Sequence, residues 1–303
     1  MNITVEIGKL KLKNPILTAS GTFGYGQEFE DFFDPSILGA IITKGTTLEP
    51  REGNNYPRMA ETSAGMLNAV GLQNKGVHYF IDEILPAITK YQTNIIVNVA
   101  GNAVEDYVEA VSILDNIDRV DAVELNVSCP NVKHGGMQFG TNYDLLKELL
   151  QKVRKTYNKT LIVKLSPNVT NIEDFALLCQ YEHADAITVA NTYLGMAIDI
   201  NTMKPKLATI TGGLSGPAIK PITLRMVYQC AQVVNIPIIA SGGIISWQDA
   251  IEYFLAGATA IQIGTANFIN PSISQDILHG IEQYLLQKNI KNIKEIIGAM
   301  KSN

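Results

Sequence analysis

The most distinctive residue of the chain is Cys129, which follows an apolar run in the sequence Glu124-Leu125-Asn126-Val127-Ser128-Cys129-Pro130-Asn131. An apolar strand normally ends in turn residues, and a lone thiol between Ser128 and Pro130 is unusual there. A thiol at the end of a strand can serve as a base or a nucleophile toward a ligand bound at that point. We therefore take Cys129 as the first catalytic candidate.

The other two cysteines, Cys179 and Cys230, lie in helical patterns and are expected to pack in the core. The chain has three cysteines in all, widely spaced and without a C-x-x-C motif. This pattern argues against a disulfide framework and against a zinc or iron–sulfur site on this chain. It is typical of a reducing compartment, so we expect a cytoplasmic protein without a metal ion.

Polar side chains recur near the ends of several apolar runs. Because side chains two residues apart on a strand share a face, four consecutive runs give the pairs Ile42 with Lys44, Ile96 with Asn98, Glu124 with Asn126, and Ile162 with Lys164. Asn191 and Thr192 follow the next run. Polar residues often end strands, but lysines within two apolar runs are not explained in this way. Barrel enzymes build their active sites at the C-terminal ends of their strands, so we expect these side chains to line a site.

Two glycine-containing strand ends indicate a phosphate site. Ser241-Gly242-Gly243 and Gly264-Thr265 each follow an apolar run, and glycine lets backbone N–H groups approach an anion. Barrels often bind phosphate in the loops after their seventh and eighth strands. The run Gly21-Thr22-Phe23-Gly24-Tyr25-Gly26 superficially suggests a dinucleotide motif, but its spacing does not match G-x-G-x-x-G.

Short β-branched runs alternate with longer amphipathic stretches, as in a parallel α/β fold. We expect strands at Ile16–Ser20, Ala40–Lys44, Asn94–Val99, Ala122–Val127, Leu161–Leu165, Ala186–Val189, Pro237–Ser241 and Ala260–Ile263. Helices are expected at Val104–Leu114, Tyr143–Thr156, Ile172–Tyr181, Ile222–Val234, Trp247–Ala256 and Ile273–Lys288, with Ser246 capping the fifth. This alternation predicts a (β/α)8 TIM barrel that forms a single domain over residues 1–303.

Three further segments complete the expected architecture. Ile3–Leu12 alternates around a Gly8-Lys9 turn and is predicted to be a β-hairpin that plugs the bottom of the barrel. Thr46–Gly76 and Tyr193–Pro221 are long and rich in Gly, Pro, Asn and Thr, and we expect them to be functional loops.

The composition excludes some classes of protein. The chain of 303 residues is 46% hydrophobic and 17% charged, which suits a large buried core. Its formal net charge of −5 argues against a nucleic-acid partner, which normally meets a basic face. No signal-peptide pattern and no apolar run long enough to span a bilayer are found, so no membrane association is expected.

The motifs together resemble dihydroorotate dehydrogenase, the flavin enzyme of pyrimidine synthesis, nearly from end to end. The resemblance rests on Ala19–Gly24, Thr43–Gly45, Asn68–Leu72, Asn126–Asn131, Val163–Pro167, Ala190–Thr192, Ser241–Gly243 and Gly264–Thr265. With a cysteine at position 129, the chain resembles the soluble class 1 enzymes, whereas the membrane-bound class 2 enzymes carry serine there. The extension Val132–Gly136 and the run Gly21–Gly26 resemble subclass 1B.

This resemblance implies one FMN per chain across the barrel mouth. The implied FMN contacts are Ser20, Lys44, Gly45, Asn98, Asn126, Lys164, Ala190 (by its backbone), Gly216, Gly242, Gly243, Gly264 and Thr265. The implied dihydroorotate contacts are Lys44, Asn68, Ala69, Val70, Gly71, Leu72, Asn126, Asn191 and Thr192. A lysine suits the substrate's carboxylate, and Asn and Thr suit its amide edges.

The resemblance also implies the chemistry. Cys129 would take the C5 proton of dihydroorotate while the C6 hydride passes to the flavin, and Lys164 would stabilise negative charge on the flavin. The loop Pro130–Gly140 could close over the substrate. We expect His134 to be a loop residue without a role, and the position of Glu124 relative to Lys164 is left open.

The electron acceptor is a separate inference. Subclass 1B enzymes pass electrons to NAD+ through a partner subunit that carries FAD and a [2Fe–2S] cluster, and two catalytic and two partner chains form a heterotetramer. The alternative is a class 1A homodimer that reduces fumarate. Three other hypotheses are an aldolase-type barrel with a Schiff base on Lys164 or Lys44, a flavin barrel that reduces uridines in RNA, and a non-catalytic phosphate-binding barrel.

Overall fold

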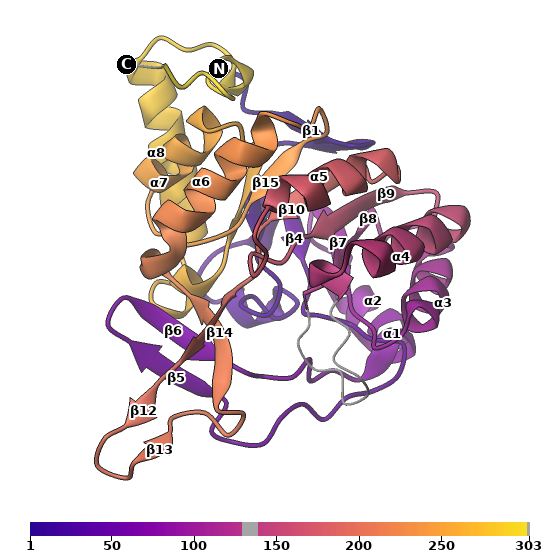
Figure 1. Ribbon diagram of the computed structural model, residues 1–303. Helices are drawn as coiled ribbons and strands as arrows, with labels where there is room; N and C mark the ends of the chain where they lie inside the picture. Colours follow the sequence, from indigo (N-terminus) through magenta and orange to yellow (C-terminus); the bar gives the residue numbers. More distant parts are fainter. Residues whose placement is uncertain (129–138, 302–303) are drawn as a thin grey trace.

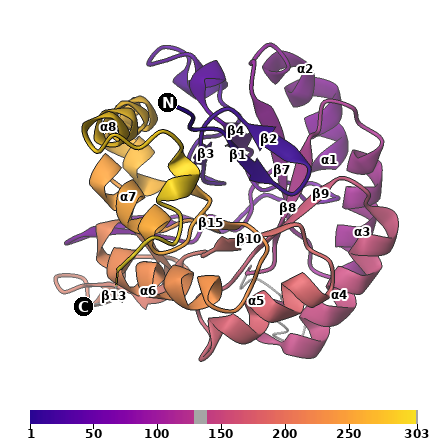
Figure 2. The ribbon, with the colours of Figure 1, turned by 90° about the horizontal axis from the view of Figure 1, so that it is seen from above.

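The structure is a computed structural model of the chain and describes residues 1–128 and 139–301. Its centre is a closed barrel of eight parallel strands (Figures 1 and 2). The strands are β3 (Ile16–Thr18), β4 (Ala40–Ile42), β7 (Asn94–Val99), β8 (Ala122–Asn126), β9 (Thr160–Lys164), β10 (Ala186–Val189), β15 (Ile238–Ala240) and β16 (Ala260–Ile263). They follow one another around the barrel in chain order, and β16 pairs with β3 to close it. The predicted TIM barrel is confirmed.

Helices surround the barrel (Figure 2). They are α1 (Gly76–Tyr79), α2 (Leu85–Ile88), α3 (Val104–Asp115), α4 (Tyr143–Thr156), α5 (Ile172–Tyr181), α6 (Lys220–Ala231), α7 (Trp247–Leu255) and α8 (Ile273–Gln287). In α4, the residues Leu146, Leu149, Leu150 and Val153 recur at helical spacing and are buried. Short helical turns lie at Gln27–Phe29, Pro35–Ile37, Phe80–Ile84, Phe139–Thr141, Pro217–Ile219, Thr265–Phe268 and Ile293–Glu295.

The predicted N-terminal hairpin is also confirmed. It consists of β1 (Val5–Ile7) and β2 (Leu10–Leu12), which pair in antiparallel fashion. The N–H of Lys9 in its turn donates to Thr160 Oγ1 at 3.1 Å, and Thr160 is the first residue of β9. The hairpin therefore packs against the N-terminal ends of the strands, at the barrel bottom.

A second sheet lies at the other end of the molecule (Figure 1). It contains β5 (Met59–Thr62), β6 (Gly65–Asn68), β11 (Tyr193–Met196) and β14 (Thr211–Ser215), in the antiparallel order β11-β14-β6-β5. The small ribbon of β12 (Ile198–Asp199) and β13 (Lys204–Pro205) extends beyond it.

The expectation that residues 46–76 and 193–221 are loops was therefore wrong. The strands of this second sheet are short and only partly buried, and β14 contains Gly212 and Gly213. Their main partners are also distant in the sequence, since Asn68 pairs with Gly213. Local periodicity cannot show a pairing of this kind, because the apolar signal of each strand is weak.

The buried core follows the barrel walls. The buried hydrophobic residues of the strands and helices are mainly Ile, Val, Leu and Ala, as expected for parallel strands that are covered by helices. Cys179 and Cys230 are buried in this core as predicted. Among the described residues, no helix has the length and apolar character needed to cross a membrane.

Candidate functional site

The barrel strands end beside the residues that the sequence marks as a site. Lys44 and Gly45 follow β4, and the glycine pair Gly242-Gly243 lies just beyond β15. Asn126 and Lys164 are the last residues of β8 and β9, where they pair in register. The fold thus gathers the predicted residues at the C-terminal mouth, where barrel enzymes hold their ligands.

Glu124 occupies the centre of a polar cluster inside the barrel and is completely buried. Its Oε1 atom accepts a hydrogen bond from Asn98 Nδ2 at 2.7 Å. Its Oε2 atom accepts from Thr188 Oγ1 at 2.7 Å and from Gln262 Nε2. Lys164 Nζ lies 3.9 Å from Glu124 Oε1 and donates to Gln262 Oε1 at 2.9 Å. The position of Glu124 beside Lys164, which the sequence left open, is thus established.

Asn126 and Asn191 lie together at the mouth. Asn191 Nδ2 donates to Asn126 Oδ1 at 3.0 Å, which joins the ends of two strands. The backbone carbonyl of Asn126 accepts from Tyr107 Oη at 2.8 Å, so α3 holds the end of β8 in place. Two of the predicted substrate contacts are therefore neighbours.

Cys129, His134 and most of the loop Pro130–Gly140 lie outside the described residues. On the near side of this segment, Ser128 Oγ donates to the Lys164 carbonyl at 3.3 Å. On the far side, the N–H of Gly140 donates to the Val127 carbonyl at 2.8 Å. The chain just beyond the end of β8 is thus adjacent to the end of β9.

Leu72 lies close to Gly45. A Cβ atom on Gly45 would lie 3.1 Å from Leu72 Cδ2 and 3.3 Å from Asn98 Oδ1. The backbone carbonyl of Leu72 accepts from Asn74 Nδ2 at 2.7 Å, and Asn74 is buried. Within the described part of the chain, the Lys44 ammonium group has no hydrogen bond or ion pair, so it can meet an anionic ligand.

The second sheet brings Asn68 and Thr192 together around Gly213. Asn68 Nδ2 donates to the Gly213 carbonyl at 3.3 Å. A Cβ atom on Gly213 would lie 2.0 Å from Thr192 Oγ1, so only glycine fits at that position. The sheet that the sequence did not reveal is therefore what assembles this part of the predicted substrate set.

The two predicted phosphate loops converge with the segment at Gly216. Gly243 has a φ of 68°, and a Cβ atom on it would lie 2.9 Å from the Gly216 carbonyl oxygen. Thr265 Oγ1 hydrogen-bonds to Ser215 Oγ at 2.7 Å, next to Gly216. A Cβ atom on Gly264 would lie 3.3 Å from Ala19 Cβ, which places this loop beside Ser20.

Hydrogen-bond donors and acceptors without partners lie at the mouth of the barrel. In residues 1–128 and 139–301, the N–H groups of Gly242, Gly243, Gly264 and Thr265 donate no hydrogen bond. Such N–H groups can bind a phosphate. Asn98 Oδ1 is buried without a partner, although buried amide oxygens are normally satisfied. Together these groups match a ligand with a phosphate at one end and hydrogen-bond donors at the other.

The N–H groups of Gly242, Gly243, Gly264 and Thr265 form what we call the phosphate cradle. Charged residues on α6 and α7 support it from the outside of the barrel. Lys220 Nζ binds both Asp249 Oδ1 and Glu252 Oε1. Burial works against ionisation of Asp249. The hydrogen bonds from Lys220, the Ile245 N–H and Ser246 outweigh it and hold the pKa of the carboxyl below its usual value. Because Lys220 is occupied in this way, the cradle relies on backbone N–H groups.

Several supporting residues were missed by the sequence analysis. They are Asn74, Tyr107, Thr188, Gly213, Tyr253 and Gln262. Tyr253, for example, is buried in α7 and donates to the Gly242 carbonyl at 2.6 Å. Gln262 lies within an apolar run and could have been found by the same signal that identified Lys164.

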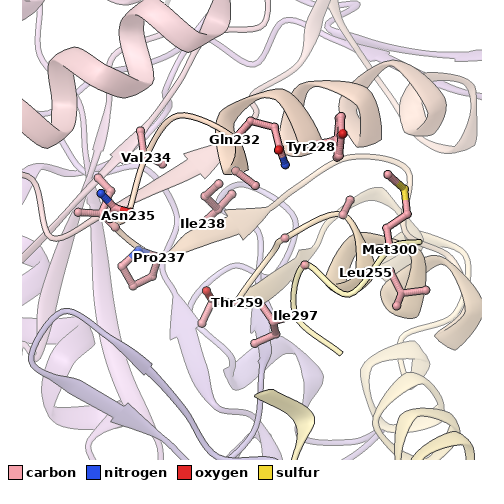
Figure 3. Close-up of a pocket in the computed structure, with 15 residues that line it drawn as sticks. Tyr228, Gln232, Val234, Asn235, Pro237, Ile238, Leu255, Thr259, Ile297 and Met300 are labelled. Atoms are coloured by element: carbon pink, nitrogen blue, oxygen red, sulfur yellow. The ribbon is translucent and has the colours of Figure 1, made fainter. Parts of the chain in front are cut away.

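A pocket of about 520 Å³ lies elsewhere on the molecule (Figure 3). It is lined by residues at the C-terminal ends of α6 and α7, among them Gln232 and Leu255, and by Ile297 and Met300. It also includes Pro237, which precedes β15, so it is at the barrel bottom. None of its lining residues belongs to the predicted site.

These features are those of a (β/α)8 barrel enzyme that binds a phosphorylated ligand at its strand ends. The family model for dihydroorotate dehydrogenase matches residues 2–285, and the chain belongs to this family. It is 58% identical over 299 residues to a protein of Bacteroides thetaiotaomicron named dihydroorotate dehydrogenase B (NAD(+)), catalytic subunit, with 99% of each chain covered. A protein of Geotalea daltonii with the same name is 53% identical over 300 residues, covering 99% of this chain and 98% of the relative. The family and subclass recognised from the motifs are confirmed.

A solved structure agrees with the architecture. The dihydroorotate dehydrogenase of Eimeria tenella, in complex with ferulenol, matches with a TM-score of 0.83, covering 98% of this chain and 88% of that one. The two chains are 22% identical, so this likeness supports the fold alone.

Asp249→Asn is expected to lower the free energy of unfolding at pH 7 by about 1.5–3 kcal/mol, the usual range for a hydrogen bond to a charged group. The folded-state pKa of Asp249 is depressed. Its ionised form therefore stabilises the fold above the unfolded pKa of about 3.9, and this contribution is lost as the pH falls through the folded value. Urea denaturation at neutral and acidic pH should show the difference between wild type and variant shrinking in acid.

Glu252→Gln is the matched control, because Glu252 contacts the same lysine but is 48% exposed. It should change the stability at pH 7 by less than about 1 kcal/mol. Equal effects of the two variants, or a difference for Asp249→Asn that does not change with pH, would show that the buried carboxylate does not hold these helices.

Proposed function

We propose that this chain oxidises dihydroorotate to orotate in pyrimidine biosynthesis, as the catalytic subunit of an NAD+-linked enzyme. The family match and the names of the relatives support the activity. The single observation that carries the proposal is the barrel mouth itself. There, the ends of the eight strands combine a backbone phosphate cradle, a buried Lys164–Glu124 pair and a cluster of amide side chains.

FMN is the cofactor that the family implies, and the described residues fit it. Gly216, Gly242, Gly243, Gly264 and Thr265 would hold its phosphate, and Ser20, Lys44, Gly45, Asn98, Asn126, Lys164 and Ala190 would contact the rest. When bound, FMN accepts the hydride that leaves C6 of the substrate. Lys164 would stabilise negative charge on the flavin ring, since its ammonium group is buried and cannot be screened by water.

The substrate would lie among residues that match its polar edges. Lys44 has no partner in the described part of the chain and would pair with the carboxylate. Asn68, Asn126, Asn191 and Thr192 can both donate and accept, as the amide edges require. Ala69, Val70, Gly71 and Leu72 would cover the ligand from the segment that Asn74 holds.

Cys129 is the proposed base for the C5 proton. A free thiol has a pKa of about 8.5, so only a small fraction is ionised near neutral pH. Ser128, which precedes Cys129 in the sequence, is hydrogen-bonded to the Lys164 carbonyl at the end of β9.

The remaining parts of the proposal concern assembly and location. The chain would act as a single domain in the cytoplasm, without nucleic acid or membrane. Relatives such as the protein of Bacteroides thetaiotaomicron are named catalytic subunit, which supports a partner chain. We propose that this partner carries FAD and a [2Fe–2S] cluster and that two chains of each kind form a heterotetramer.

Cys129→Ser is expected to slow flavin reduction by dihydroorotate by roughly a hundred- to ten-thousand-fold, the usual contribution of a general base. The pH optimum should move upward, because a hydroxyl is a weaker acid than a thiol. Stopped-flow measurement of flavin reduction across a range of pH tests both effects. An unchanged rate and pH profile would refute the assignment of Cys129.

The electron acceptor is tested by assaying the chain alone and with its co-purifying partner. Turnover with NAD+ is expected only in the presence of the partner, because this chain has no cysteine set for a cluster. Fumarate should not support turnover by the chain alone. Rapid turnover with fumarate and no partner would instead favour the class 1A alternative.

A further inference from the structure

Glu124 is a buried charge that the proposed chemistry does not use. Its two carboxylate oxygens accept hydrogen bonds from Asn98, Thr188 and Gln262, which lie on β7, β10 and β16. A buried carboxylate is costly unless it is paired and hydrogen-bonded. The barrel centre thus contains a carboxylate whose burial is unfavourable by itself. The groups that it contacts indicate its role.

The carboxylate fixes the orientation of the Asn98 amide. A carboxylate only accepts hydrogen bonds, so the group that faces it must be the Asn98 Nδ2 donor. The amide oxygen then points elsewhere, and it is buried without a partner near Gly45 at the end of β4. Glu124 therefore makes Asn98 an acceptor at the mouth of the barrel.

The same carboxylate balances the charge of Lys164. The ammonium nitrogen lies 3.9 Å from Glu124 Oε1 and has its hydrogen bond to Gln262. Within residues 1–128 and 139–301, this is its single hydrogen bond, so other N–H donors of the ammonium group remain available. In a buried site, a negative charge this close offsets much of the field of the lysine.

We infer that Glu124 is a positioning residue that orients Asn98 and Lys164 toward the flavin and reduces the positive potential that Lys164 exerts on it. This inference rests on the proposed binding of FMN at the mouth. Glu124 thereby keeps reduced FMN from being over-stabilised, so that electrons can leave for the next acceptor.

The test is the equilibrium constant for two-electron reduction of bound FMN, measured against a reference dye. Glu124→Gln keeps the shape and removes the charge. It is expected to raise this constant by about tenfold, the size expected for one unit charge about 10 Å away at an effective dielectric constant of about 20. A tenfold change corresponds to about 30 mV in the midpoint potential of a two-electron couple.

Two further variants separate charge from structure. Thr188→Val removes one hydrogen bond to the same carboxylate at no change in charge, and it should leave the constant within about twofold of the wild-type value, since one neutral hydrogen bond carries no net charge. Glu124→Met also removes the charge, without adding an amide, and should raise the constant by the same factor. It replaces Glu124→Gln in the test if Glu124→Gln does not fold.

An unchanged constant in the folded charge-removing variants would overturn the inference, as would an equal shift in Thr188→Val. These outcomes can be distinguished from failure of the proposed function. If the proposed function is wrong, the wild-type chain itself would bind no FMN, and both proposals would lose their basis.

Discussion

The buried carboxylate of Glu124 is the interaction on which the arrangement of the site depends. Through Asn98, Lys164, Thr188 and Gln262 it connects side chains from β7, β9, β10 and β16 to its own strand, β8. An unpaired carboxylate at this place would be strongly destabilising, so each partner must keep its position. The network therefore sets the geometry of the barrel interior directly below the mouth.

At the periphery of the site, the groups available to a ligand are backbone N–H groups and not a buried charge. In the phosphate loops, the Gly242 carbonyl accepts a hydrogen bond from Tyr253 Oη, and the Gly264 carbonyl accepts one from the Asn267 N–H. Within the described residues, the N–H groups of Gly242, Gly243, Gly264 and Thr265 have no partner. Satisfied acceptors and unsatisfied donors together make a surface that favours an anion. Lys220 reinforces the loops from outside, where Asp249 and Glu252 neutralise its charge.

Much of the fold could be predicted because its signals are local. The barrel strands are short apolar runs with β-branched residues, and the glycines and lysines at their ends mark the mouth without reference to the rest of the chain. The second sheet could not be predicted, because its strands are half exposed and join residues near 68 to residues near 213. The Glu124–Lys164 pair needed the structure for the same reason, since strand register does not fix where long side chains end. The role of Cys129 stays a prediction, because it lies outside the described residues.

The central claim is that the barrel mouth is a binding site for FMN. It is tested most directly by purifying the chain, releasing any bound flavin by denaturation and quantifying it against the protein. The account predicts FMN in an amount equimolar with the chain, either as purified or after incubation with FMN and removal of the excess. A folded preparation that contains no flavin and takes up none would contradict it.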